Sequence, residues 1–251
     1  MRKFGLIGYP LSHSFSKKYF TEKFEKEGIT DAQYELYSLE SIDQLPQLLA
    51  REPSLVGLNV TIPYKEQVIP FLDELDPKAE AIGAVNTIVI KEGKLKGYNT
   101  DYYGFKNSLV KLVGALTMPE KALILGTGGA SKAIKACLED LGIDFQFVSR
   151  NASESNLTYE DLNASTLKHI STSTLIINTT PLGTAPNTEA LPDLPYKQLT
   201  HNHYLYDLVY NPLITAFMQK GIDAKCWVKN GLEMLHGQAE KSWKIWNNSH
   251  L

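Results

Sequence analysis

Apolar and polar positions alternate in short blocks along the first half of the chain, and the blocks predict strands and helices in turn. Within residues 16–27, Phe20 and Phe24 stand four positions apart and so share one face of a helix. The predicted elements of this half are strands at 4–7, 33–39 and 55–60 and helices at 16–27 and 42–50. Such alternation predicts a mainly parallel sheet with helices on its faces.

A hairpin is expected next, because Glu92-Gly93 separates two alternating segments at 87–91 and 94–98. A two-residue loop that ends in glycine is typical of a β-hairpin. An antiparallel ribbon is therefore expected to close the first half. A helix over 102–112 and a loop over 114–120 follow.

The second half repeats the alternation of strands and helices. Its predicted elements are strands at 122–125, 145–149, 175–178, 205–208 and 224–228 and helices at 130–141 and 232–246. Gly142 is expected to end the first of these helices, and polar residues 151–156 are expected to form a loop. No strand follows the last helix, which could pack back on the first half. The pattern as a whole predicts a two-domain α/β protein.

Composition and charge narrow the class of protein. The 251 residues are 43% hydrophobic and carry a net charge of -3, which allows a sizeable core and gives no basic excess for nucleic acid. Cys137 and Cys226 lie far apart and outside any zinc-like cluster, so we expect a reducing compartment and no metal. No apolar run approaches the roughly 18 residues of a bilayer span. The start of the chain reads as a strand rather than a signal peptide, and a cytoplasmic protein is expected.

A glycine-rich turn, Gly126-Thr127-Gly128-Gly129-Ala130-Ser131, lies between a predicted strand and a predicted helix. That context suits a dinucleotide site, because glycines let the backbone approach a pyrophosphate and the helix N-terminus supplies N–H donors. Ser131 replaces the third glycine of the usual pattern. An ordinary strand-to-helix connection is the alternative, and the strand-turn-helix context favours the dinucleotide.

The end of the next strand points to the form of the cofactor. NAD sites tend to carry an acidic residue there, whereas this chain has Ser149-Arg150-Asn151. A guanidinium can bind a 2′-phosphate through paired charged hydrogen bonds. The position therefore favours NADP, although a solvated surface arginine is the simpler alternative.

Lys65 and Asp101 form a candidate pair for proton transfer. Lys65 follows a strand and Pro63, and ligands collect at the carboxyl ends of parallel strands. Taken alone, the lysine could be a surface charge and the aspartate an N-cap for the following helix. The pair becomes a stronger catalytic candidate because other polar residues are expected at the same strand ends, namely Asn59, Thr61, Asn86, Asn99 and Thr100. A lysine held by a carboxylate can relay the proton that alcohol oxidation releases, so the chain is expected to transfer hydride to or from a small hydroxylated substrate.

These residues belong to a longer series of motifs by which the chain resembles the shikimate dehydrogenase family over nearly its whole length. The motifs are Gly8-Tyr9-Pro10-Leu11-Ser12-His13-Ser14-Phe15-Ser16, Asn59-Val60-Thr61-Ile62-Pro63-Tyr64-Lys65, Gly83-Ala84-Val85-Asn86-Thr87, Gly97-Tyr98-Asn99-Thr100-Asp101, the glycine-rich turn, Asn178-Thr179-Thr180-Pro181-Leu182-Gly183, Asp207-Leu208-Val209-Tyr210-Asn211-Pro212 and Gly231-Leu232-Glu233-Met234-Leu235-His236-Gly237-Gln238.

The resemblance implies NADPH-dependent reduction of 3-dehydroshikimate to shikimate, and the reverse, within aromatic amino-acid (chorismate) biosynthesis. It implies an N-terminal α/β substrate domain of residues 1–101 and 232–251, to which the last helix returns. It also implies a Rossmann-type NADP-binding domain of residues 102–231. The expected partners are the small-molecule substrate and NADP(H), with no nucleic acid and no membrane, in a monomer or homodimer.

The resemblance also implies roles for single residues. Lys65 and Asp101 would transfer the proton. The substrate would be held by Ser14, Ser16, Thr61, Asn86, Tyr210 and Gln238. The cofactor would be held by Gly126, Thr127, Gly128, Gly129, Ala130, Ser149, Arg150, Thr179, Val209 and Gly231. The two serines could equally be ordinary loop and cap residues.

Four positions depart from the family pattern. Lys17 stands where the serine motif usually ends in proline, and Ser149 and Asn151 replace the usual asparagine and threonine around the arginine. Glu154 lies where some relatives add a second basic residue, which would weaken the phosphate clamp. The alternatives are an NAD-using quinate/shikimate dehydrogenase and a non-catalytic ligand-binding relative. The intact pair Lys65 and Asp101 argues against the second of these.

Overall fold

The computed structural model describes residues 1–11, 15–114, 116–151, 156–164 and 168–248. The chain divides into two compact units. The first comprises Met1–Thr100 with Ala239–Leu251, and the second comprises Asp101–Gln238. One boundary therefore falls inside the last helix, α10 (Leu232–Asn248).

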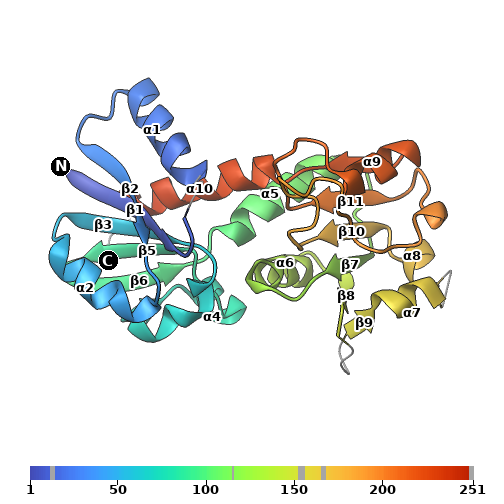
Figure 1. The fold of residues 1–251 in the computed structure, drawn as a ribbon, viewed down its shortest axis with the longest axis horizontal. Coiled ribbons are helices and arrows are strands. Elements are labelled where there is room, and N and C mark those ends of the chain that lie inside the picture. Colours follow the sequence, from blue (N-terminus) through green and yellow to red (C-terminus); the bar gives the residue numbers. More distant parts are fainter. Residues whose placement is uncertain (12–14, 115, 152–155, 165–167, 249–251) are drawn as a thin grey trace. The chain divides into compact units, whose positions relative to one another are not determined.

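The first unit contains a six-stranded sheet in the order β2-β1-β3-β5-β6-β4 (Figure 1). Its strands are β1 (Arg2–Gly8), β2 (Ala32–Ser38), β3 (Leu55–Val60), β4 (Glu74–Leu75), β5 (Thr87–Lys91) and β6 (Lys94–Tyr98). β1 runs parallel to both β2 and β3, whereas β5 is antiparallel to β3 and to β6.

The predicted hairpin is confirmed, but it does not close the sheet. Glu92 and Gly93 both have positive φ, 52° and 78°, as a tight turn that follows the twist of its strands requires. The two-residue strand β4 adds to β6 in parallel and forms the edge. So short a strand has no periodicity of its own, and its pairing is decided by the neighbouring strand.

Helices cover both faces of this sheet (Figure 1). Besides α10 they are α1 (Phe15–Glu27), α2 (Leu45–Arg51), α3 (Tyr64–Gln67) and α4 (Pro77–Ile82), with 3-10 turns at Ile42–Gln44 and Ile69–Phe71. Phe4 and Leu6 of β1 join α1 and α10 in one core. Ile7, which points to the other face, packs with residues of α2, α3 and α4. This alternation is the period of two expected of a sheet buried on both faces.

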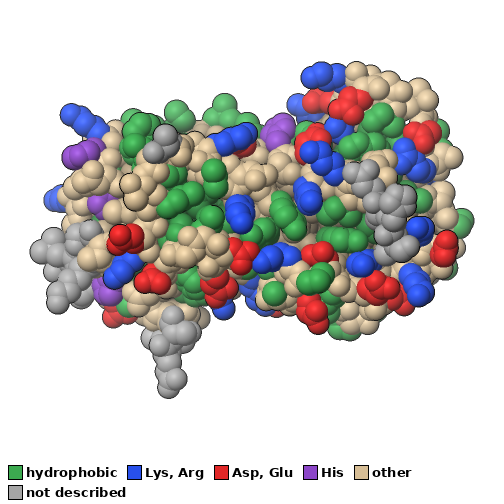
Figure 2. Space-filling view, turned by 180° about the vertical axis from the view of Figure 1, so that it is seen from behind, with side chains coloured by type: hydrophobic (Ala, Val, Ile, Leu, Met, Phe, Trp, Pro, Cys, Tyr) green, Lys and Arg blue, Asp and Glu red, His purple; other side chains and the backbone are tan. Residues whose placement is uncertain are grey.

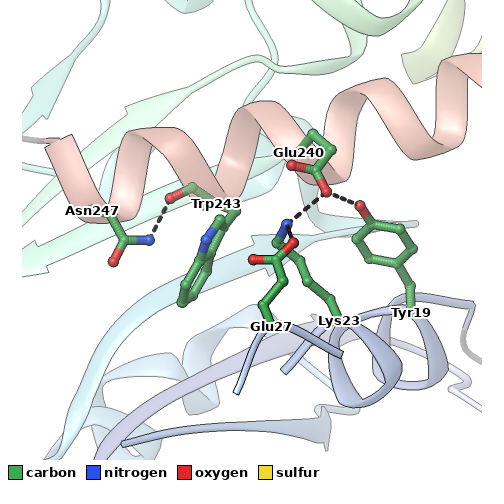
Figure 3. A network of polar contacts seen from close by, with 6 residues as sticks. All are labelled: Tyr19, Lys23, Glu27, Glu240, Trp243 and Asn247. Atoms are coloured by element: carbon green, nitrogen blue, oxygen red, sulfur yellow. Dashed lines mark hydrogen bonds and ion pairs between the residues drawn. The ribbon is translucent and has the colours of Figure 1, made fainter. Parts of the chain in front are cut away.

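The C-terminal part of α10 packs on the first unit, as expected from the absence of a strand after it. Trp246 lies over Gly57, where an added Cβ would come within 2.4 Å of the indole nitrogen, and Nε1 donates to the Ile88 carbonyl at 2.9 Å. Figure 3 shows the polar side of the same contact. Lys23 Nζ of α1 lies 2.8 Å from a Glu240 carboxylate oxygen, and the Tyr19 hydroxyl donates to that carboxylate.

The second unit contains a six-stranded sheet in which every pair is parallel, in the order β12-β11-β10-β7-β8-β9. The strands are β7 (Lys121–Leu125), β8 (Asp144–Ser149), β9 (Asn156–Thr158), β10 (Leu175–Asn178), β11 (Tyr204–Asp207) and β12 (Trp227–Lys229). From β7 the chain first adds strands on one side and then, from β10, on the other. That is the doubly wound order of dinucleotide-binding folds, with its switch point between β7 and β10. The predicted two-sheet α/β fold is confirmed.

The helices of this unit lie on both faces of its sheet (Figure 1). They are α5 (Asp101–Val113), α6 (Gly129–Asp140), α7 (Tyr159–Ala164), α8 (Lys168–Thr172) and α9 (Ala216–Asp223), with a 3-10 turn at Tyr196–Gln198. Buried residues of α7, α8 and α9 share a core with β7, β10 and β11. On the other face, the Tyr206 ring lies 4.9 Å from Phe105 of α5, and its hydroxyl donates to Ser108 Oγ at 2.8 Å.

Two sequence predictions in this unit were wrong. Asn156, assigned to a loop, begins the edge strand β9, which pairs with β8. The last strand begins at Trp227 rather than at 224, because α9 is capped at Ala224 and the chain reverses at Lys225, whose φ is 61°. Both errors concern three-residue strands whose extent depends on their neighbours.

The mixture of positive and negative side chains on the surface agrees with the small net charge of -3. Figure 2 shows Lys and Arg side chains interspersed with Asp and Glu over one face. Within the described part of the chain, none of the helices combines the length and the apolar character of a membrane span.

Candidate active site

The glycine-rich turn lies at the carboxyl end of β7, as predicted. Gly126 has a φ of 102°, which favours glycine, and an added Cβ would lie 3.0 Å from Thr179 Oγ1. Gly128 precedes α6 in extended conformation, an added Cβ there would meet no atom within 4 Å, and no acidic residue stands in the first turn of that helix. Backbone N–H groups and the positive end of the helix dipole thus face an unobstructed, anion-accepting turn. These residues fit a pyrophosphate.

Three further predicted cofactor residues lie in loops at the same edge of the sheet. The N–H and hydroxyl of Thr179 both donate to the Leu125 carbonyl, at 3.0 and 2.7 Å, which ties the end of β10 to the end of β7. The N–H of Gly231 donates to the Val209 carbonyl at 3.0 Å. A Cβ at Gly231 would come within 2.1 Å of the Leu208 carbonyl oxygen, so only glycine fits there.

Ser149 and Arg150 lie at the carboxyl end of β8, beside β7. Ser149 is the last residue of the strand, and the Arg150 side chain is exposed. Asn151 N–H donates to Ser149 Oγ at 3.4 Å. Glu154 lies outside the described residues. Because the Arg150 side chain is exposed, salt would screen its attraction to any anion.

In the first unit, Lys65 lies shortly after strand β3, as predicted. It is the second residue of α3, half-buried, and its carbonyl accepts from the N–H of Val85 at 2.7 Å. Thr61 directly follows β3 and is half-buried, with its N–H donating to the Ile7 carbonyl at 2.9 Å. Ser16 lies in the first turn of α1 and is half-buried. Ser14 lies outside the described residues.

Asn86 lies in a buried network of polar side chains. Its Oδ1 accepts from the N–H of Thr100 at 2.7 Å, and its Nδ2 lies 3.0 Å from Thr100 Oγ1. Asn59 Nδ2 donates to the Asn86 carbonyl at 3.2 Å, and Asn59 Oδ1 accepts from the Tyr34 hydroxyl at 2.7 Å. The network thus connects Asn86, through Asn59, to Tyr34.

Three members of this network were missed from the sequence, namely Tyr34, Thr87 and Ser242. Ser242 Oγ of α10 lies 2.8 Å from Thr87 Oγ1 and 3.1 Å from Asn59 Nδ2. The available signal was Ser242 itself, a small polar residue just before Trp243 and Trp246 on a helix expected to pack on the first half. Burial makes each of these hydrogen bonds important, since an unpaired buried polar group costs about 1–3 kcal/mol.

The remaining candidates belong to the second unit. α5 begins at Asp101 itself, whose side chain is buried. Tyr210 lies in the turn after β11, and burial raises the pKa of its hydroxyl. Gln238 is 9% exposed, and its Nε2 donates to the Leu235 carbonyl at 3.0 Å.

Together, the doubly wound sheet and the glycine turn at its switch point define a dinucleotide-binding α/β protein. A sequence profile described as the shikimate dehydrogenase substrate binding domain matches residues 6–88. A shikimate dehydrogenase (NADP(+)) of Clostridium beijerinckii is 38% identical over 100% of this chain and 94% of its own. The chain belongs to the shikimate dehydrogenase family, as its motifs indicated.

Solved structures agree with this assignment. The crystal structure of shikimate dehydrogenase 1 from Peptoclostridium difficile has a TM-score of 0.84 at 38% identity, covering 100% of this chain and 93% of that one. Shikimate 5-dehydrogenase from Thermus thermophilus, in complex with NADP(H) and shikimate, has a TM-score of 0.83 at 30% identity, covering 99% and 94%.

Proposed function

We propose that this chain catalyses the reversible NADPH-dependent reduction of 3-dehydroshikimate to shikimate, a step towards chorismate and the aromatic amino acids. The observation that carries the proposal is the full-length likeness to NADP(+)-dependent shikimate dehydrogenases. The Thermus relative, solved with both shikimate and NADP(H), supports the same pair of ligands here. The glycine turn of this chain fits the pyrophosphate of the cofactor.

In this reaction, bound NADPH supplies hydride to the carbonyl carbon. The chain's own residues must then deliver a proton to the developing alkoxide, and we assign this to Lys65 with Asp101 as its partner. Substrate binding falls to Ser14, Ser16, Thr61, Asn86, Tyr210 and Gln238. The buried network around Asn86 supports this assignment, because it fixes the orientation of that amide before substrate arrives.

On the cofactor side, the pyrophosphate is assigned to Gly126, Thr127, Gly128, Gly129 and Ala130. Ser149 and Arg150 bind the 2′-phosphate, and Thr179, Val209 and Gly231 approach the rest of the cofactor. The same proposal makes residues 1–101 and 232–251 the substrate domain and 102–231 the NADP domain, in a monomer or homodimer. The compact second unit extends a little further, to Gln238.

The activity is tested by mixing the protein with shikimate and NADP and following absorbance at the reduced-nicotinamide band. A rise in absorbance is expected with this pair and a much slower one with quinate and NAD. Equal rates with quinate and NAD would favour the quinate/shikimate alternative. No rate with either pair would favour a ligand-binding relative.

Replacing Ser14 or Ser16 by alanine is expected to raise KM for shikimate. Each change leaves the substrate carboxylate short of one donor, at about 1–3 kcal/mol, which is roughly 5- to 150-fold. Steady-state kinetics of both variants measure the effect. Lys18→Ala is a matched control, because the Lys18 side chain on α1 is exposed. An unchanged KM in both serine variants would remove them from the site.

Replacing Arg150 by alanine is expected to raise KM for NADP severalfold and to leave KM for NAD nearly unchanged, because only NADP carries the 2′-phosphate. The preference for NADP should shrink as salt rises, since the Arg150 side chain is exposed. Glu154→Arg should lower KM for NADP, because it replaces a negative charge with a positive one. Kinetics with both cofactors test the idea, and equal weakening of NADP and NAD would refute the phosphate clamp.

A further inference from the structure

A carboxylate that the reaction scheme does not use lies at the carboxyl end of β11. Asp207 is fully buried. Its Oδ1 accepts from Asn178 Nδ2 at 2.9 Å and from the N–H of Val209 at 3.0 Å, while Oδ2 accepts from Thr215 Oγ1 at 2.6 Å. Asn178 and Thr215 are buried as well, at 0% and 1% exposure. One side chain thus receives hydrogen bonds from the end of β10 and from two positions in the connection between β11 and α9.

Each donor controls the shape of the segment to which it belongs. Asn178 Oδ1 accepts from both the N–H and the hydroxyl of Thr180, at 3.1 and 2.6 Å, and so holds the turn that carries Thr179. Thr215 caps α9 by accepting from the N–H of Met218 at 3.2 Å. The segment containing Val209 leads to Tyr210 and hydrogen-bonds to Gly231.

Stability alone does not favour an aspartate at this position. Burial raises the pKa of the Asp207 carboxyl to about 6, against the opposing effect of its three hydrogen bonds. A protein with a buried charge is often no more stable, or is less stable, than one with a well-packed apolar side chain of similar volume at the same position. What a carboxylate offers here is acceptor capacity in several directions at once, which the single oxygen of an asparagine does not match.

The place of the network in the sheet indicates its purpose. In doubly wound sheets a dinucleotide spans the switch point, with its pyrophosphate at the first glycine turn and the ribose that distinguishes NAD from NADP at the end of the second strand. Those positions correspond here to β7 and β8. The nicotinamide half of the cofactor is therefore expected at the loops after β10 and β11, which Asp207 connects through its hydrogen bonds.

We propose that Asp207 is a positioning residue, which sets the loops carrying Thr179 and Val209–Tyr210 in the geometry that binds the nicotinamide half of the cofactor. The proposal rests on the NADP site of the proposed function. Asp207 itself touches neither substrate nor cofactor in this scheme. It acts through the hydrogen bonds of Asn178, Val209 and Thr215.

The test measures binding of two probes to the full-length protein by isothermal titration calorimetry. NADP carries both halves of the cofactor, whereas adenosine 2′,5′-bisphosphate carries only the adenine half and the 2′-phosphate. In Asp207→Asn and Thr215→Val the dissociation constant for NADP should rise on the order of tenfold, as expected for one buried hydrogen bond to a charged group. The constant for the bisphosphate should stay within about twofold of wild type.

Thr215→Ser is the matched control, because it keeps the hydroxyl that donates to Asp207 and removes only a methyl group. It should bind NADP nearly as wild type does, and this comparison remains valid if Asp207→Asn fails to fold. Equal weakening of both probes in Thr215→Val, or unchanged NADP binding, would overturn the positioning role. If wild type binds the bisphosphate but not NADP, or binds neither, the proposed NADP function itself fails.

Discussion

Replacing Lys65 by methionine is expected to lower kcat about 10²- to 10⁴-fold, the usual contribution of a general acid–base group. KM for shikimate should change little, because methionine keeps most of the length of the side chain and removes only the proton-carrying amine. Lys65 is half-buried at the start of α3, so the substitution is not expected to unfold the protein. Steady-state kinetics in both directions measure the effect. Normal kcat with a raised KM would assign Lys65 to binding instead.

Asp101→Asn, combined with this variant, tests whether the two residues act as a unit. The single change is expected to lower kcat as well. The double variant should lose less than the sum of the two single losses in activation free energy, because residues with a shared role couple in a double-mutant cycle. Full additivity would show that they act independently. Lys91→Met, a lysine change at the end of β5, is a suitable control.

Replacing Trp246 by alanine is expected to lower the free energy of unfolding by about 3–5 kcal/mol, the usual effect of deleting a buried large aromatic side chain. Its ring lies 4.8 Å from Phe4 and 5.5 Å from Phe20, centroid to centroid. Its Nε1 also donates to a buried carbonyl, so the variant loses packing, a hydrogen bond and the cover over Gly57. Urea unfolding followed by circular dichroism measures the loss.

Trp227→Ala is the matched control for this prediction. Trp227 is 53% exposed at the start of β12, and its removal should change stability by no more than about 0.5 kcal/mol. Trp246→Phe should lie between the two, because it keeps the ring but loses the donor. If Trp246→Ala is no more harmful than Trp227→Ala, the C-terminal segment of α10 is not a structural part of the first core.

Most regular elements could be predicted because their signals are local. The predicted bounds of β3, β5, β6 and β10 match those observed. Alternation of side chains and the positive-φ turn at Glu92-Gly93 need no information from distant residues. The helix end at Gly142 has the same origin, with a φ of 68°. The edge strands β4 and β9 carry no such signal, since two or three residues become a strand only when a partner is present.

The residues of the site divide in the same way. The sequence by itself determined the family, the glycine turn, the position of Lys65 after a strand and the strand–helix alternation of the second half, because motif spacing and periodicity are properties of neighbouring residues. Only the tertiary structure decided that Ser242 completes the network around Asn59 and Asn86 and that Asp207 joins the end of β10 to the connection between β11 and α9. Hydrogen bonds between buried side chains depend on which distant segments the fold brings within about 3 Å, and that distance is not encoded in any local pattern.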